Sequence, residues 1–256
     1  MTSKKSTIVR VVNWLAQPLS ILSPCLAARL LEQLFLTPRR WRRPHREACW
    51  LGGANRSVIA FDEERVFPLF SWGEGPTVLL AHGWSGRGSQ MAAFAQPLVQ
   101  AGYRVVAFDA PGHGEADGRL TGVPEMARAI QKVADEVGPI HAVVAHSLGT
   151  AATSIALSGG LRVDRLVYIA PPENPGGFLW RVAHFLGFSE EVARRTADRI
   201  QRRFSFSLEQ ARGATLAPAM EVDLLVIHDL DDQEVAYQEG ADLVDAWPGA
   251  VLVTHT

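Results

Sequence analysis

Cysteine is scarce in this sequence: Cys25 and Cys49 are the only two among 256 residues. Two cysteines are too few for a disulfide framework, and no CxxC or Cys/His spacing of the kind that binds zinc is present. The sequence therefore predicts free, buried thiols in a cytoplasmic protein, and no metal site.

The sequence also lacks a strong excess of charge, with 25 basic and 27 acidic side chains and a formal net charge of −2. Low-complexity tracts and internal repeats are absent as well. This composition excludes disorder, collagen and coiled coil, and it gives no reason to expect nucleic acid as a partner. The length suits two small domains or one α/β domain of ordinary size.

An uninterrupted apolar run long enough to cross a membrane is missing near the N-terminus. Eighteen uncharged residues separate Arg10 from Arg29, but Pro18, Pro24 and four polar side chains interrupt them. A spanning helix needs about 20 predominantly apolar residues. The basic start imitates a signal peptide and Cys25 a lipoprotein site, although Pro24 stands where such sites have a small residue. We expect a cytoplasmic protein, with membrane association through the N-terminus as the alternative.

Charge is distributed unevenly along the chain. Residues 1–46 carry nine basic side chains and one acidic side chain, whereas the remainder has a net charge of −10. We interpret residues 1–56 as a helical and basic N-terminal segment. Such a segment either forms a solvated collar at the edge of a domain or has a role of its own.

The pattern after Ser23 predicts an amphipathic helix in this segment. Ser23 and Pro24 suit the N-cap and the first helical position, and Pro38 follows the end of the run. Between them, apolar residues recur at helical spacing: Leu26, Leu30, Leu31, Leu34 and Phe35. We expect this apolar face to cover the domain. The alternative is a peripheral contact with a lipid surface, with the arginines of residues 39–46 on phosphates.

From residue 57 onward, short apolar runs alternate with longer helical patterns. Strands are expected at residues 57–61, 65–72, 77–81, 105–108, 142–145, 166–169, 224–227 and 250–254. Helices are expected at residues 89–101, 123–137, 148–157 and 235–246. Buried runs that alternate with helices predict an α/β fold in residues 57–256, with a mostly parallel, doubly wound sheet.

One interval interrupts this alternation. More than 50 residues between Ile169 and Leu224 contain no convincing strand. Ser189 begins one expected helix, and Ser207 with Gln210 forms a capping box for another. We interpret residues 171–221 as a helical lid inserted over the ends of the strands, where ligands bind in open α/β sheets.

A serine follows one of the buried strands directly. The sequence Ala145-His146-Ser147-Leu148-Gly149 stands between an expected strand and an expected helix. It resembles the nucleophile elbow, in which a serine on a tight strand-to-helix turn has its hydroxyl raised above the sheet. Ala145 replaces the first glycine that is usual in this motif. An ordinary helix N-cap at Ser147 is the alternative.

Two further motifs follow strands in the expected order, His82-Gly83-Trp84 and the run of residues 109–114. With the elbow, they give residues 57–256 a resemblance to the α/β-hydrolase fold superfamily, and to a bacterial subgroup of serine hydrolases within it. The resemblance implies an oxyanion hole made by the backbone N–H groups of Trp84 and Leu148, and no cofactor. It also implies that His82, His113 and His146 are structural rather than bases.

The resemblance places the catalytic acid after the next strand, in the acidic run of residues 229–234. Aligning Val235 with the valine of the family's pattern selects Asp232, with Asp231 as the fallback. This carboxylate would orient a histidine and stabilise its cation. A charged helix start is the alternative interpretation.

The catalytic base is the weakest part of the pattern. The family places its histidine after the last strand, where this sequence offers His255, several residues early. We expect that the chain is a fragment without the usual histidine, that His255 is the base, or that the protein does not hydrolyse, because an unassisted serine is a poor nucleophile.

Two functional hypotheses follow. The first is a serine hydrolase of carboxylic esters. Lipid-like acyl esters are suggested as its substrates, because Phe178, Trp180 and Phe185 give the insertion an apolar character. Its partner would be a small-molecule ester. The second is a catalytically impaired or non-catalytic binding protein of the same fold, associated with a membrane surface.

Overall fold

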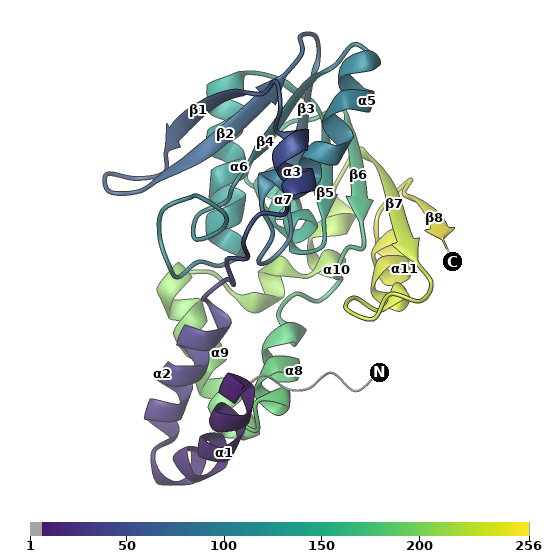
Figure 1. Cartoon of the computed structure of the whole chain (residues 1–256). Helices are drawn as coiled ribbons and strands as arrows, with labels where there is room; N and C mark the ends of the chain where they lie inside the picture. Colours follow the sequence, from purple (N-terminus) through teal and green to yellow (C-terminus); the bar gives the residue numbers. More distant parts are fainter. Residues whose placement is uncertain (1–6, 256) are drawn as a thin grey trace.

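A computed structural model describes residues 7–255 of the chain, and eight strands form one sheet in it (Figure 1). The order across the sheet is β1-β2-β4-β3-β5-β6-β7-β8. The strands β1, β2 and β4 are antiparallel neighbours, and every later pairing is parallel. Their bounds are β1 (Asn55–Ala60), β2 (Val66–Trp72), β3 (Thr77–Ala81), β4 (Arg104–Phe108), β5 (Ile140–His146), β6 (Arg165–Ile169), β7 (Asp223–Asp229) and β8 (Val251–His255).

All eight expected strands are present, and the α/β class with its mostly parallel sheet is confirmed. Apolar side chains explain the central position of β3, which is buried along its whole length and has a parallel partner on each side. The strand β8 lies at the edge and is largely exposed.

Helices cover both faces of the sheet. Residues of α6 (Val123–Val137), α7 (Leu148–Ser158) and α11 (Tyr237–Ala246) pack into one apolar cluster with it. The other face packs against α4 (Gly88–Met91), a 3₁₀ turn and α5 (Ala95–Gln100). The single helix expected at residues 89–101 is therefore interrupted. The expected helix at residues 123–137 is present with those bounds.

The interval between β6 and β7 is helical, as expected. It contains α8 (Gly177–Phe185), α9 (Glu190–Phe204), α10 (Gly213–Leu216) and two short 3₁₀ turns. Ser189 caps α9 by accepting a hydrogen bond from the Val192 backbone at 3.3 Å. The capping box of Ser207 and Gln210 is present, although it begins a 3₁₀ turn rather than an α-helix.

Two helices of the N-terminal segment join this insertion rather than the sheet. They are α1 (Thr7–Leu22) and α2 (Pro24–Phe35), and Figure 1 shows both beside α8 and α9, on the side of the sheet where β6, β7 and β8 end. We refer to α1, α2, α8 and α9 as the helical cap. Its members share an apolar cluster of their own, separate from the two clusters at the sheet. None of the helices in residues 7–255 is long and apolar enough to span a membrane.

The helix α2 has two different faces, and the prediction of its apolar face was only partly correct. Ala27, Ala28 and Leu31 are buried against the insertion, whereas Leu26 and Leu34 are exposed. Small residues predominate on the buried face because α2 lies closely against α9: the Thr196 hydroxyl on α9 donates a hydrogen bond of 3.3 Å to the Ala28 carbonyl. The helix thus covers the domain at its helical insertion, where it packs against α9, and not at the sheet.

A buried carboxylate also joins α2 to α9. Glu32 accepts hydrogen bonds from Arg199 Nε at 2.6 Å and from Arg203 Nε at 2.8 Å. Burial raises the pKa of Glu32, but the two arginines outweigh it and hold that pKa below its usual value. The one acidic side chain of residues 1–46 therefore connects α2 to the insertion, and it stays charged at neutral pH.

The linker between α2 and β1 lies along the domain. Arg40 donates three hydrogen bonds to the carbonyl groups of Gly112, Ala116 and Gly118. The short helix α3 (His45–Trp50), which the sequence did not predict, follows this linker. Both cysteines are free, but they are exposed and not buried as expected. Cys25 is the second residue of α2 and Cys49 lies in α3, and both side chains are on the exposed side of their helix.

Candidate active site

Ser147 lies on a strained turn between β5 and α7. Its φ of 48° and ψ of −125° belong to a region that side-chain-bearing residues rarely occupy. The Ser147 backbone N–H donates to the Ile169 carbonyl at 2.9 Å, which fixes the turn to the neighbouring strand. This conformation differs from an ordinary N-cap, which has extended φ and ψ and a side chain bonded to the helix. No such cap bond is formed by Ser147.

Close backbone approaches explain the small residues around Ser147. A Cβ atom on Gly149 would lie 2.5 Å from the His82 carbonyl oxygen and 2.8 Å from that of Ala81. A Cβ atom on Gly83 would lie 3.0 Å from the Ser147 Cβ. Ala145, the departure from the usual glycine, is fully buried in the ladder between β3 and β6, so the sheet accommodates its methyl group.

The loop after β3 lies beside the elbow. The Gly86 backbone N–H donates to the Gly83 carbonyl at 3.0 Å, which closes a tight turn around Trp84 and Ser85. Ser85 has a φ of 57°, as the third residue of such a turn requires. The Ser85 hydroxyl accepts a hydrogen bond of 2.9 Å from the Arg39 backbone, so the N-terminal linker helps to hold the loop.

Two backbone N–H groups near Ser147 are candidates for binding an oxyanion. Leu148 is the first residue of α7, so its N–H has no acceptor within the helix. Trp84 follows Gly83 in a tight turn, and the absence of a side chain on Gly83 allows this turn to pack against Ser147. The two residues selected from the sequence therefore come from different strands, β3 and β5, and meet beside one serine.

His82 and Asp109 hold this loop in place. The buried His82 accepts a hydrogen bond from the Ala110 backbone at Nε2 and donates from Nδ1 to the Gly83 carbonyl at 2.8 Å. Asp109 accepts from the Gly88 backbone at 2.7 Å and from the Glu115 backbone at 2.8 Å. Because both nitrogens of His82 are occupied, it does not present a base to Ser147.

His113 completes this scaffold. Its ring lies 5.1 Å from the rings of both His82 and Trp84. Burial, with a smaller contribution from His82, lowers the pKa of His113 to about 3. An imidazole that is neutral and packed against two rings supports the Trp84 loop, which is consistent with the structural role expected for His82 and His113.

Asp232 lies in the loop that follows β7. Its Oδ1 atom accepts hydrogen bonds from the backbones of Glu234 at 2.8 Å and Val235 at 2.9 Å. Its Oδ2 atom is 3.9 Å from Nε2 of the buried His228, which instead bonds the Val235 carbonyl at 2.9 Å. Asp231 is exposed, so Asp232 is the better held of the two carboxylates.

The loop of Asp232 approaches the elbow through His146. Partial burial lowers the pKa of His146, while the negative charges of Asp232 and Glu234 oppose that shift. Glu234 and Val235 also line the same cavity as Ser147. Two strand spacings, roughly 10 Å, separate β5 from β7. Ser147 and the Asp232 loop therefore lie at the same end of the sheet, two strands apart.

The structure does not bring His255 to Ser147. His255 pairs with Asp229 at the end of the edge strand β8, and it is exposed. Three strand spacings, roughly 14 Å, separate β8 from β5. Within residues 7–255, no histidine is hydrogen-bonded to the Ser147 hydroxyl, and the role of His255 as the base stays a prediction.

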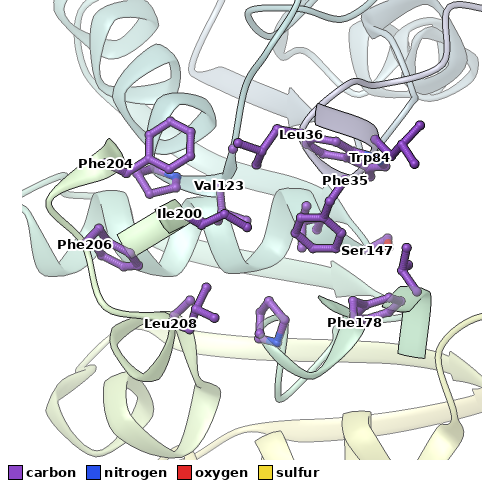
Figure 2. Close-up of a pocket in the computed structure, with 18 of the residues that line it drawn as sticks. Phe35, Leu36, Trp84, Val123, Ser147, Phe178, Ile200, Phe204, Phe206 and Leu208 are labelled. Carbon is purple, nitrogen blue, oxygen red and sulfur yellow. The ribbon is translucent and has the colours of Figure 1, made fainter. Parts of the chain in front are cut away.

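A cavity of about 310 Å³ opens beside Ser147. This volume is at the lower end of the range of roughly 300–1,000 Å³ that small-molecule sites occupy. Figure 2 shows Ser147 and Trp84 on one side of the cavity and Phe204, Phe206 and Leu208 on the other. Apart from Ser147 and Glu234, the lining is almost entirely apolar.

Residues of α2 form part of this cavity, which the sequence did not predict. Leu34 and Phe35 of α2 and Leu36, which directly follows it, line the cavity together with residues of α8 and α9. Figure 2 shows Phe35 and Leu36 among the side chains of the lining. The sequence offered one signal, the helical spacing of the leucines, but this spacing does not reveal what the helix covers. The contacts of Glu32 with α9, more than 160 residues away in the sequence, bring these side chains to the site.

Ser147 lies on a strained turn between a buried strand and a helix, beside a glycine-flanked loop with spare backbone N–H groups. This arrangement is typical of the active site of an α/β-hydrolase fold. Residues 78–254 match the model of the Alpha/beta hydrolase family. The chain belongs to this family.

Curated relatives and solved structures agree with this assignment. The chain is 32% identical over 146 residues to the pimeloyl-[acyl-carrier protein] methyl ester esterase of Vibrio campbellii, covering 55% of this chain and 53% of that protein. It is 32% identical over 169 residues to the non-heme haloperoxidase of Rhodococcus erythropolis, covering 61% and 58%. The chain thus spans little more than half the length of these relatives.

A solved structure extends the similarity over a larger part of the fold. The esterase EaEST from Exiguobacterium antarcticum superposes with a TM-score of 0.59 at 17% identity, covering 78% of this chain and 90% of that one. At this identity the likeness concerns the fold.

Proposed function

We propose that the protein is a serine hydrolase of carboxylic esters and that Ser147 is its nucleophile. The observation that carries the proposal is the strained Ser147, whose turn opens onto an apolar cavity that Trp84 and Leu148 also line. Membership in a family whose curated relatives include an ester esterase supports it.

The proposed reaction begins with attack of the Ser147 oxygen on the ester carbonyl. A histidine takes the serine proton, and Asp232 orients that histidine. The N–H groups of Trp84 and Leu148 stabilise the negative charge on the carbonyl oxygen, and each can contribute about 3–4 kcal/mol in the transition state. The alcohol leaves with the proton, and water then hydrolyses the acyl-enzyme to release the acid and restore Ser147.

The cavity favours esters whose acyl group is apolar. Phe178 and Val182 of α8, Phe204 at the end of α9 and Phe35 of α2 contribute to its lining. These side chains offer no hydrogen-bond partner to a polar acyl chain, so burying one there would cost free energy. In this proposal the helical cap acts as the lid, because α2, α8 and α9 each supply apolar side chains to the cavity that Ser147 lines.

A fluorophosphonate probe tests the role of Ser147. We expect the wild-type protein to be labelled at Ser147, and we expect the variant Ser147→Ala not to be labelled. Ser158→Ala, an exposed serine at the end of the same helix, is the matched control and should label as wild type. Absence of labelling in folded wild-type protein would contradict the proposal.

The same probe tests His255. If His255 acts as the base, His255→Ala should slow labelling by about 100-fold or more, which is the usual contribution of a general base. Unchanged labelling would show that Ser147 is activated without His255. The circular dichroism of the variant should remain unchanged, because His255 is exposed on the edge strand.

Phe206 should limit the length of the acyl group. It lines the cavity away from Ser147 and is only partly buried, so Phe206→Ala should extend the cavity at little cost in stability (Figure 2). We expect the rate of labelling by long-chain alkyl fluorophosphonates to rise about tenfold relative to short-chain probes. Trp180→Ala, in α8 but outside the lining, should leave this ratio unchanged.

A further inference from the structure

The N-terminal part of the chain leaves an unusual share of its apolar side chains in water. Eight of the sixteen large apolar side chains that are exposed in the described structure lie between residues 14 and 50. The three most exposed are in α1: Leu22 at 83%, Ile21 at 81% and Trp14 at 78%; Trp41 in the linker after α2 follows at 62%, and Leu26 of α2 is 53% exposed. Exposed patches of this kind mark contact surfaces.

These side chains are not the ones that hold the hairpin in the cap. Ala16 of α1 and Ala27, Ala28 and Leu31 of α2 are buried in the cap cluster. The helix α2 therefore uses one face for the cap and presents a second one outward. Internal packing of the described chain accounts for the first face only.

The charge of this surface is of one sign. Arg29, Arg39, Arg42 and Arg46 are exposed, and no ion pair to a carboxylate is formed by any of them in the described structure. The only acidic side chain in residues 1–46, Glu32, is buried beneath α9 and neutralised by Arg199 and Arg203. The exposed side chains of residues 12–46 thus include apolar and cationic ones and no anionic one.

We propose that the α1–α2 hairpin and the linker that follows it dock on the surface of an anionic phospholipid bilayer. The apolar side chains would enter the boundary between headgroups and acyl chains, and the arginines would remain among the phosphates. Two tryptophans of this part of the chain, Trp14 in α1 and Trp41 in the linker, are exposed, and tryptophan is enriched at the membrane interface. A protein partner that covered four cations would need matching carboxylates, whereas a bilayer with anionic lipids supplies the charge and the apolar layer together.

Docking would also bring the active-site cavity to the lipid. Leu34 is both exposed and part of the cavity lining, and Phe35 and Leu36 follow it directly into the cavity. This consequence rests on the proposed function. Docking itself does not, so Ser147→Ala should bind vesicles as the wild type does.

Vesicle sedimentation with the whole chain tests the docking. We expect the protein to sediment with phosphatidylcholine vesicles that contain phosphatidylglycerol, to bind pure phosphatidylcholine much more weakly, and to be released by salt. The paired variant Ile21→Asn with Leu22→Asn should bind the anionic vesicles about tenfold more weakly. Arg39→Gln with Arg42→Gln should also weaken binding and reduce its dependence on salt.

Matched controls use the same changes elsewhere on the molecule. Val251→Asn with Val253→Asn replaces two exposed apolar side chains on β8, and Arg119→Gln with Arg162→Gln removes two exposed charges from loops. Both should bind as wild type. The proposal is overturned if the wild type does not sediment with anionic vesicles, or if the hairpin variants and the control variants bind them equally. It is also overturned if Ile21 and Leu22 prove to support a dimer that does not bind vesicles.

Discussion

Replacing Gly149 with alanine should destabilise the protein by about 3 kcal/mol or more. The new Cβ would lie 2.5 Å and 2.8 Å from two carbonyl oxygens of the chain that runs from β3 into the Trp84 loop. Neither oxygen belongs to a flexible side chain, so the helix α7 or the loop must shift, and overpacking of this kind costs roughly 1–3 kcal/mol or occasionally more. Urea unfolding followed by circular dichroism measures the loss.

The same substitution at the other end of α7 provides the control. Gly159 has a φ of −81°, and a Cβ there would have its nearest neighbour at 3.3 Å. Gly159→Ala should be nearly neutral, because alanine can adopt this backbone conformation. Equal unfolding free energies for the two variants would show that the elbow tolerates a side chain at Gly149. Fluorophosphonate labelling should fall in Gly149→Ala even below the unfolding transition, because the shift displaces Leu148.

Removing Arg87 should destabilise the protein by about 3–5 kcal/mol. Arg87 donates to both carboxylate oxygens of Glu47, at 2.7 Å and 2.8 Å, and both side chains are buried. Arg87→Ala leaves the Glu47 carboxylate in the interior with the Ser89 hydroxyl as its remaining side-chain donor. The exposed pair of Arg165 and Asp223 is the control, and Arg165→Ala should change the unfolding free energy by less than about 1 kcal/mol.

The pH dependence distinguishes a lost ion pair from lost packing. Burial raises the pKa of Glu47, but the hydrogen bonds of Arg87 and Ser89 and the charge of Arg87 hold it below 4.5 in the wild type. Because the folded-state pKa is lowered, this stabilisation is present above pH 4.5 and is lost as the pH falls through the folded-state value. In Arg87→Ala, protonation relieves the unpaired Glu47. The difference between the two proteins should therefore shrink with acidification, and a constant difference would indicate packing alone.

The sheet and the arrangement of the site were predictable from the sequence because both depend on local patterns. Apolar runs of strand length gave all eight strands, and the residues that follow β3, β5 and β7 necessarily meet at one edge of a parallel sheet. Trp84, Leu148 and Ser147 were brought together for that reason. Ser147 and the Asp232 loop also approach each other, since Glu234 and Val235 share the cavity with Ser147.

The parts that depend on distant packing were not predictable. Pro18 is an unfavourable residue inside a helix, yet α1 continues through it. Leucine spacing predicted one apolar face on α2, whereas the tight approach to α9 selected Ala27 and Ala28 for burial and left Leu26 in solvent. Helical periodicity indicates which side chains share a face, but it does not indicate how closely another helix packs against that face.

The cavity beside Ser147 is built partly from residues that lie outside the region shared with the family. The residues shared with the family begin at Val78, whereas Leu34, Phe35 and Leu36 lie well before that point. Part of the cavity wall thus lies outside the region that matches the family model. A chimera that exchanges the first 56 residues between two such proteins would exchange part of the binding surface while leaving Ser147 and Asp232 in place. Under the proposed function, such an exchange would alter substrate preference without a substitution in residues 78–254.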